Sequence, residues 1–424
     1  MARRLTPAGY RPRVVDAEME ASLAASPAVL IEGPRACGKT WTGKRFALSE
    51  ALLDATASSL LASNMDPAAV LEGPTPRLLD EWQLAPEIWN PMRRACDDRA
   101  RAGQFVLTGS ANPPDDITRH SGAGRVLRVR MRPMSLLESG LSDGSISLNG
   151  LFGAGRPTAR DGGLKLGDVI EAACRGGWPR LLDTDLGAAL RATRGYLDEI
   201  SRTDVSRVDG VARNPAGVRK LLSSLGRNIS SEASFATLSK DTADEEGIVD
   251  RRTVASYMAA LERLFVVEDL RAWKPHITSR AQLRSAPKRH LADPSLAVAA
   301  LQASPESVMQ NRKYAGLLFE SLVVRDLRVY GQANNLDLSH YRDSDGLEVD
   351  VVIKHPDGRW IAAEVKLGSE QGIEEGIRSL HRLRSRVDPD RSGTPSRLVI
   401  ITASGYGFEH PEGVSIIPIT ALAP

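Results

Sequence analysis

Residues 33–40 read Gly-Pro-Arg-Ala-Cys-Gly-Lys-Thr, and they constrain this chain more than any other segment. The octapeptide matches G-x-x-x-x-G-K-[ST], the P-loop, whose glycines allow a tight turn with N–H groups pointing at phosphate oxygens. The apolar run 28–31 precedes the loop, and residues 41–48 can form a helix behind it. Strand, loop and helix therefore follow in the order that the motif requires, and we expect a bound nucleoside triphosphate, ATP.

Each position of the loop has an expected role. Lys39 is expected to reach the β- and γ-phosphates, and Thr40 to offer its hydroxyl to Mg²⁺. The remaining loop residues are expected to bind ATP: Gly33, Pro34, Arg35, Ala36, Cys37 and Gly38. The Cys37 side chain is expected to point away from the phosphates, so that binding survives its presence.

A P-loop needs an acidic residue at the end of a second strand to hold the metal. The stretch 76–81 ends in Asp80 and Glu81, which follow two leucines. We expect Asp80 to lie on the metal side, and Glu81 to polarise the attacking water as a positioned base. A second buried-type strand, 105–110, ends in small polar residues, and Gly124 places Arg125 in a loop ahead of the strand-like run 126–129.

These features together resemble the bacterial AAA-like and STAND-like P-loop ATPases whose C-terminal region is a domain of unknown function. The likeness spans nearly the whole chain and rests on these local stretches: Gly33-Pro34-Arg35, Asp66-Pro67, Leu79-Asp80-Glu81-Trp82-Gln83, Leu107-Thr108-Gly109-Ser110, Gly124-Arg125, 133–138 and Gly176-Gly177-Trp178-Pro179. The resemblance implies that Ser110, with Thr108 as second candidate, senses the γ-phosphate. Arg125 is a candidate arginine finger. Cys37 departs from the pattern, because Gln-Val or a similar pair is usual before Gly-Lys-Thr.

Composition excludes several classes of protein. A net charge of +2 gives no global basicity, so any contact with nucleic acid must come from local patches. The three cysteines have no metal-ligand spacing, which favours a reducing compartment. No apolar run approaches the roughly 18 residues of a membrane span, and the N-terminus lacks the apolar core of a signal peptide. We expect a cytoplasmic protein with no membrane contact.

The sequence pattern in the middle of the chain predicts first a loop-rich stretch and then helices. Residues 139–163 are rich in Gly and Ser and predict a loop-rich excursion, whereas 167–205 favour helices that form a lid. Apolar residues then recur at helical spacing from Val218 to Leu225, a second helix is expected over 250–261, and 264–270 is a candidate wing strand. This region resembles a winged helix, which contacts either a protein partner or DNA.

A second constellation lies near the C-terminus. Two strand-like stretches, 347–354 and 359–366, flank a Pro-Asp-Gly turn. If glycine takes the left-handed conformation of a three-residue loop, Asp350 lies opposite Glu364, and Lys366 lies on the same face. Facing carboxylates repel each other unless a divalent cation, Mg²⁺ or Mn²⁺, binds between them.

This arrangement resembles the PD-(D/E)xK nuclease superfamily over about residues 305–424. The resemblance implies a catalytic set of Asp350, Glu364 and Lys366, with Asp350 and Glu364 as metal ligands. An acidic residue on the preceding helix often completes such a site, and Glu320 lies in an otherwise apolar stretch where a carboxylate needs a partner.

The expected fold is therefore α/β: a P-loop parallel sheet with helices, a helical and winged-helix middle region, and a C-terminal α/β nuclease-like domain. The expected parts are an ATPase domain (1–165), a helical lid (166–210), a winged-helix domain (211–300) and a nuclease-like domain (301–424). The leading hypothesis is an ATP hydrolase coupled to a metal-dependent nuclease acting on DNA. The alternative is an ATP-dependent signalling or scaffolding protein whose C-terminal domain binds a partner without cutting. Homo-oligomers are compatible with either, because an arginine finger can enter a neighbour's site.

Overall fold

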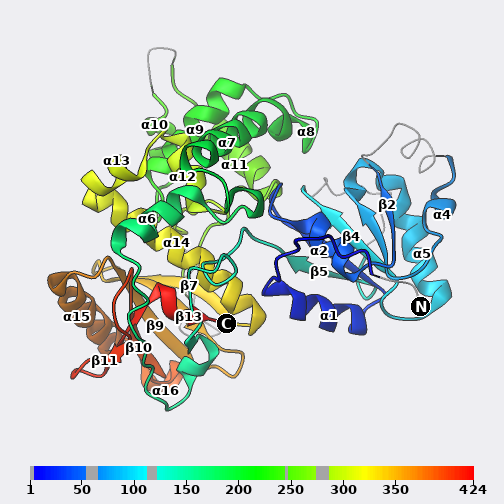
Figure 1. The fold of residues 1–424 in the computed structure, drawn as a ribbon. Coiled ribbons are helices and arrows are strands. Elements are labelled where there is room, and N and C mark those ends of the chain that lie inside the picture. The colour runs from blue at the N-terminus through cyan, green and yellow to red at the C-terminus, as the bar shows by residue number, and fades with distance from the viewer. Residues whose placement is uncertain (1–3, 54–64, 112–121, 244–246, 274–285) are drawn as a thin grey trace. The chain divides into compact units, whose positions relative to one another are not determined.

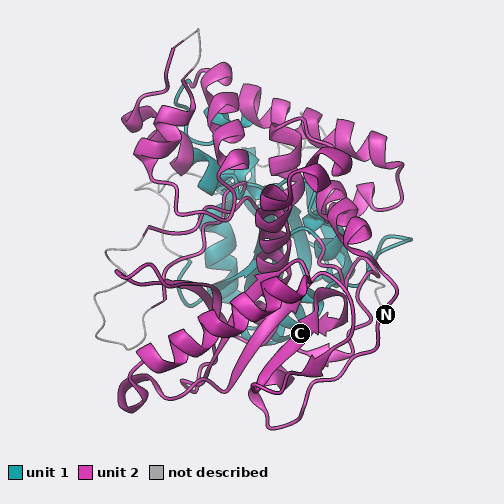
Figure 2. Cartoon of the chain, turned by 90° about the vertical axis from the view of Figure 1, so that its left-hand side faces the viewer, with its two compact units in different colours: residues 1–133, 204–212, 260–265 teal, residues 134–203, 213–259, 266–424 magenta. Residues whose placement is uncertain are grey.

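The computed structural model describes residues 4–53, 65–111, 122–243, 247–273 and 286–424. The chain divides into two compact units, coloured separately in Figure 2. Unit 1 contains residues 1–133, 204–212 and 260–265, and unit 2 contains residues 134–203, 213–259 and 266–424. The mixed α/β class expected from the sequence is confirmed, with a parallel sheet in unit 1 and a mixed sheet in unit 2 (Figure 1).

Unit 1 is built on a parallel five-stranded sheet with the order β2-β3-β4-β1-β5. Its strands are β1 (Ala28–Glu32), β2 (Ser49–Leu52), β3 (Arg77–Asp80), β4 (Phe105–Gly109) and β5 (Val126–Arg130). The central strands β1 and β4 are buried on both faces, which explains why they read as continuous apolar runs. Because β4 lies between β1 and β3, its carboxyl end separates the P-loop from Asp80.

Helices cover this sheet. α1 (Val15–Ala25) packs on β1 and β5, and α2 (Lys39–Phe46) packs on β1, β3 and β4. A separate apolar cluster joins Trp82 and residues of α5 (Trp89–Arg99) to Leu30 and Leu79 of the sheet. The short α4 (Pro67–Val70) contacts α5. These helices cover the sheet, whose carboxyl edge carries the P-loop.

The helices expected over 167–205 are present as α6 (Leu166–Arg175), α7 (Leu186–Glu199) and a π-helix, Ile200–Asp204, which continues into α8 (Val205–Arg207). α9 (Pro215–Arg227) buries Val218, Leu221, Leu222 and Leu225, as their spacing predicts. α10 (Phe235–Asp241), α11 (Arg251–Arg263), α12 (Pro294–Ala300) and α13 (Pro305–Gln310) follow. Within the described ranges, no helix is both long and apolar enough to cross a bilayer.

Beyond α11 the chain makes antiparallel bridges between Val267 and Leu291 and between Leu270 and Lys288. Residues 264–270 were expected to form the wing strand; they form no continuous strand and make only these two isolated bridges. Residues 244–246 and 274–285 of the expected winged helix lie outside the described residues. The winged helix therefore stays a prediction.

The C-terminal part of unit 2 is a six-stranded mixed sheet with the order β11-β12-β10-β9-β8-β7. Its strands are β7 (Asp337–Arg342), β8 (Glu348–Lys354), β9 (Trp360–Lys366), β10 (Arg397–Thr402), β11 (Phe408–Glu409) and β12 (Val414–Pro418). The long α14 (Arg312–Ala333) packs on β7, β8 and β9, and α15 (Glu370–Arg386) packs on β8, β9 and β10. The short α16 (Pro389–Ser392) follows α15.

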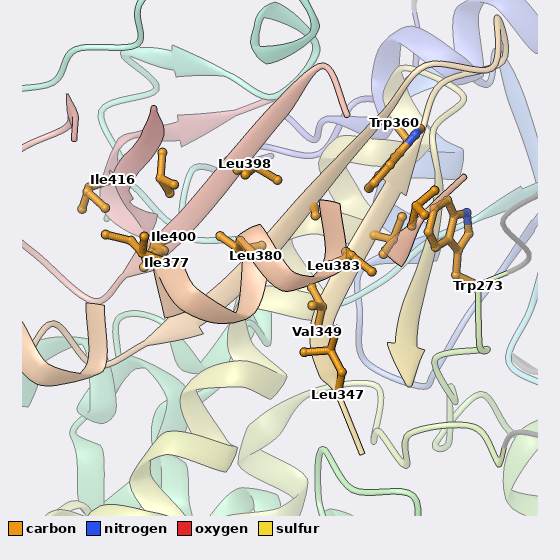
Figure 3. Packing of buried hydrophobic residues seen from close by; sticks show 14 residues of the cluster. Trp273, Leu347, Val349, Trp360, Ile377, Leu380, Leu383, Leu398, Ile400 and Ile416 are labelled. Atoms are coloured by element: carbon orange, nitrogen blue, oxygen red, sulfur yellow. The ribbon is translucent and has the colours of Figure 1, made fainter. Parts of the chain in front are cut away.

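Figure 3 shows the apolar contact between α15 and this sheet. Ile377, Leu380 and Leu383 of α15 belong to one buried cluster with side chains of β8, β9, β10 and β12. Trp273 and Trp360 extend the cluster, with ring centroids 4.7 Å apart. The helix is thereby fixed over the strands that carry Asp350 and Glu364.

The loop-rich stretch 139–163 packs against this C-terminal sheet. β6 (Ile146–Ser147) pairs in parallel with β13 (Leu422–Ala423). Arg397 of β10 donates hydrogen bonds to the carbonyls of Leu151, Gly153 and Gly155. One partly buried guanidinium thus satisfies three carbonyls of a segment with little secondary structure, which explains how so irregular a loop is held in place.

Candidate functional site

The P-loop leaves the carboxyl end of β1 and enters α2 at Lys39. Ala36 and Gly38 have positive φ angles of 62° and 106°, so the backbone turns tightly between strand and helix. The end of β5 lies very close to the start of the loop. A Cβ atom at Gly33 would lie 2.0 Å from the carbonyl oxygen of Met131, so only glycine fits there.

Lys39 and Thr40 lie where the motif predicts them. Lys39 is only 5% exposed, and its Nζ donates to the carbonyls of Gly33 (3.0 Å) and Pro34 (2.8 Å), which hold the ammonium against the loop. The Thr40 hydroxyl donates to Oδ2 of Asp80 at 3.2 Å. A hydroxyl and a carboxylate from two elements therefore meet beside the phosphate-binding loop, as a Mg²⁺–nucleotide site needs.

The polar end of β4 organises the two acidic residues. Thr108 is fully buried; its hydroxyl donates to Oδ1 of Asp80 and accepts from the backbone N–H of Glu81. The Ser110 hydroxyl donates to Oε2 of Glu81 at 2.9 Å. Both residues expected to sense phosphate thus hold Asp80 and Glu81 in position.

Gln83 belongs to the same hydrogen-bonded group as Glu81 and Ser110, and the sequence analysis gave it no role. Its Nε2 donates to the same Glu81 oxygen and, at 3.2 Å, to the Ser110 hydroxyl. Glu81 itself takes a left-handed backbone conformation, with φ at 53°. Its carboxylate is therefore oriented by two side chains and by a constrained backbone, which suits a base that must be aimed at one water.

Two arginines tie the loop to the rest of unit 1. The buried Arg13 donates to the carbonyls of Cys37 and Arg132, each at 2.8 Å, and so joins the loop to the chain after β5. Arg35 pairs with Asp204 of the π-helix at 3.0 Å. The Cys37 side chain is buried, with Sγ 3.8 Å from the Met131 carbonyl oxygen.

Arg125 lies far from the phosphate-binding loop of its own chain. Its carbonyl accepts from the N–H of Ala28, so it lies at the amino end of β1, whereas the P-loop leaves the carboxyl end. A strand of this length separates the two by roughly 16 Å. The Arg125 guanidinium binds Asp97 at 2.6 Å. A role as arginine finger therefore stays a prediction, and this position suits only the site of a neighbouring copy.

The C-terminal hairpin has the register that the turn predicts. His355 pairs with Arg359 across the turn, Gly358 takes φ of 96°, and Lys354 pairs with Trp360. The pair farthest from the turn is Val351 opposite Ala363, so the backbone pairing does not include Asp350. The Asp350 side chain contacts the other strand instead, because its Oδ2 accepts a hydrogen bond from the N–H of Val365 at 2.9 Å.

A buried lysine lies at the centre of the C-terminal carboxylates. Nζ of Lys288 is 2.8 Å from Oε1 of Glu320, 2.8 Å from Oε1 of Glu348 and 3.0 Å from Oδ1 of Asp350. Its side chain is only 1% exposed. Lys366 separately pairs with Glu364 at 2.8 Å. The predicted residues Glu320, Asp350, Glu364 and Lys366 thus line one pocket, and two of them, Glu320 and Asp350, bind a cation that the sequence had not indicated.

Burial and the mutual charges perturb this cluster strongly. Burial, reinforced by the charge of Asp350, raises the pKa of Glu320 and of Glu364 to about 8. Burial also acts to raise the pKa of Asp350, but the nearby Lys288 and Lys366 lower it to about 2. The raised pKa values of the two glutamates follow from burial and from an excess of carboxylates, because two ammonium groups lie among four neighbouring carboxylates.

The carboxylates do not fit a metal ion as they are arranged here. Among the described residues, no group of three or more Asp, Glu, His or Cys side chains is arranged to hold one. The oxygens that would converge on a metal converge on Nζ of Lys288 instead. Lys288 comes from an unremarkable Pro-Lys-Arg-His stretch, so its role had no sequence signal. Glu348 did have a sequence signal, because strand alternation puts it on the same face of the strand as Asp350.

Comparisons with known proteins assign the N-terminal region. Residues 25–139 match the AAA domain family, and residues 166–307 and 315–422 match two domains of unknown function, DUF8612 and DUF4143. Together with the P-loop geometry, the first match supports a P-loop ATPase. The descriptions of the other two families name no activity.

The matched proteins come from mycobacteria and an archaeon. The uncharacterized proteins Rv2008c of Mycobacterium tuberculosis and Mb2031c of Mycobacterium bovis are each 26% identical over 368 residues, which cover 86% of this chain and 75% of the relative. A solved structure, the Walker-type ATPase PABY2304 of Pyrococcus abyssi, is 13% identical with a TM-score of 0.43. The match covers 71% of this chain and 99% of that one.

Proposed function

We propose that this chain binds ATP with Mg²⁺ at the P-loop and hydrolyses it. The observation that carries the proposal is the convergence of Lys39, Thr40, Asp80 and Glu81 at the carboxyl edge of the parallel sheet. Lys39 binds the β- and γ-phosphates, Thr40 and Asp80 hold the Mg²⁺, and Glu81 takes the proton of the attacking water. Phosphoryl transfer needs little else than such positioning and charge.

Nucleotide binding tests the first half of this proposal. Lys39→Ala removes the ammonium that faces the phosphates, so we expect loss of ATP binding in isothermal titration calorimetry. Lys44→Ala is the matched control, because Lys44 lies one turn later on α2 and pairs with Glu50 at 2.9 Å. Equal ATP affinity in wild type and Lys39→Ala would contradict the proposal.

We propose further that the C-terminal domain is a metal-dependent nuclease that acts on DNA. Support comes from the hairpin register and from the meeting of Asp350, Glu364 and Lys366 in one pocket of about 530 Å³. Arg342 and Arg382 also line this pocket, and arginine is a side chain that contacts a phosphate backbone. Its carboxylate oxygens are ligands of the kind that Mg²⁺ or Mn²⁺ prefers, once they are free to bind one.

DNA cleavage with Mn²⁺, with and without ATP, tests the nuclease proposal. Asp350→Ala should abolish cleavage of single- and double-stranded DNA. Asp337→Ala should not, because Asp337 is exposed at the start of β7 and outside the pocket. Cleavage by Asp350→Ala at the wild-type rate would assign the activity to a contaminant or to another site.

A second candidate function is a signalling or scaffolding ATPase whose C-terminal domain binds without cutting. The specific observation in its favour is Lys288, whose ammonium satisfies the carboxylates that a nuclease uses for metal. Arg251 and Arg252, both exposed at the start of α11, offer a contact to DNA or to a protein. A DNA mobility shift that weakens steeply with salt, without cleavage under any condition, would favour DNA binding, and absence of any shift would favour a protein partner.

A further inference from the structure

The position of Lys288 is fixed by its backbone. Its N–H and C=O both bond to Leu270, each at 2.9 Å. The next residue, Arg289, is anchored by a hydrogen bond to the carbonyl of Ala233 and an ion pair with Asp269. The Lys288 side chain therefore enters the carboxylate cluster from a segment whose backbone is fixed by hydrogen bonds.

The ammonium of Lys288 binds the same oxygens that a metal would need. Glu320 and Asp350 are the helix and strand acids of the proposed nuclease site, and one oxygen of each lies within 3.0 Å of Nζ. A divalent ion held by these oxygens at about 2.1 Å would lie within about 5 Å of the ammonium, and two cations so close in a buried site repel strongly. The ammonium of Lys288 and a metal ion therefore compete for these oxygens.

We propose that Lys288 is a tethered cation that keeps the C-terminal acidic cluster free of metal, so that the site is inactive while the ammonium is in place. This inference rests on the proposed nuclease function, because it assigns the regulation of that same site. Glu348, which pairs with Lys288 at 2.8 Å and is partly exposed, holds the ammonium from the pocket side. Removal of the ammonium would free Glu320 and Asp350 at once.

Mn²⁺ binding to the nucleotide-free protein, followed by electron paramagnetic resonance, tests the inference without relying on activity. Without nucleotide, the P-loop lacks the phosphates that retain a metal. Wild type should bind no Mn²⁺ tightly in the C-terminal domain. Lys288→Met keeps the length of the side chain and removes its charge, so Mn²⁺ should bind about tenfold or more tightly than to wild type. Lys288→Arg should behave as wild type, since the cation remains.

The double variant Lys288→Met with Asp350→Asn assigns the new site, because it should lose the Mn²⁺ that Lys288→Met gains. Lys288→Gln gives a second neutral variant should the methionine disturb folding, and thermal unfolding with and without Mn²⁺ reports on both. Mn²⁺ binding to wild type also tests the inference. Tight Mn²⁺ binding that Asp350→Asn abolishes would overturn the inference, and so would neutral variants that fold but bind no more Mn²⁺ than wild type.

DNA cleavage then separates this inference from the function on which it rests. If Lys288→Met gains Mn²⁺ but cuts no DNA, the nuclease proposal fails and Lys288 still excludes the metal. If wild type binds Mn²⁺ and cuts DNA as fast as Lys288→Met, the nuclease stands and the role of Lys288 is refuted. Cleavage by Lys288→Met at least about tenfold faster than by wild type supports both.

Discussion

Adding one methyl group to the P-loop gives a sharp test of its geometry. In Gly33→Ala the new Cβ would lie 2.0 Å from the Met131 carbonyl oxygen and 3.1 Å from the carbonyl carbon. Contacts of this kind stay above 3.0 Å, and both partners here are backbone, which cannot rotate away as a side chain can. The loop and the end of β5 must therefore separate by roughly 1 Å.

That displacement moves the phosphate-binding N–H groups, and a misplacement of about 1 Å can cost about 100-fold in rate. We expect ATP turnover of Gly33→Ala to fall by about that factor, measured by phosphate release at saturating ATP and Mg²⁺. Gly162→Ala is the matched control, since its new methyl group meets nothing within 4 Å. Turnover of Gly33→Ala within about threefold of wild type, with the same fold by circular dichroism, would refute the packing argument.

Three further changes test other parts of the account. Thr108→Val removes the hydroxyl that bridges Asp80 and Glu81, so kcat should fall while ATP affinity, measured by calorimetry, changes little. Because burial raises the pKa of Glu320 to about 8, the folded chain holds a proton that the unfolded chain releases near its ordinary value of 4.5. The stability that this group contributes should therefore be lost as pH rises from about 4.5 to about 8, and denaturation curves of Glu320→Gln should show a flatter pH dependence. Leu380→Ala empties a fully buried position between α15 and the sheet, and should lower the free energy of unfolding by about 2–5 kcal/mol in urea titrations; a loss below about 0.5 kcal/mol would contradict that packing.

Local sequence patterns predicted the elements that short-range chemistry determines. The P-loop lies between a strand and a helix because its glycines and the flanking apolar runs require that order. The hairpin register followed from the Pro-Asp-Gly turn, which fixes how two adjacent strands pair. In both cases the determining residues are neighbours in the sequence.

Local sequence patterns did not predict the order of the strands in the sheet, because spacing along the chain does not reveal which strand lies between two others. β4 enters between β1 and β3, and this order makes Thr108 and Ser110 partners of Asp80 and Glu81. The position of Arg125 could have been anticipated. It precedes its strand, and in a parallel sheet the residues before a strand lie at the edge opposite to those after one.

Lys288 was unpredictable for a different reason. It lies 62 positions from Asp350 and 32 from Glu320, and long-range contacts such as the bridge to Leu270 bring it to the cluster. A sequence motif records which residues a site needs when it works, and it does not reveal a distant side chain that competes for the same partners. The acidic set was therefore found from sequence, and its counter-ion required the structure.

ATP turnover by wild type and Glu81→Gln, with ATP binding measured on the same preparations, tests the central claim most directly. The account predicts that both proteins bind ATP with similar affinity and that only wild type releases phosphate, because the glutamine keeps the contacts with Ser110 and Gln83 but cannot take a proton from water. Phosphate release by Glu81→Gln at the wild-type rate would remove Glu81 from the mechanism, and failure of both proteins to bind ATP would contradict the nucleotide site itself.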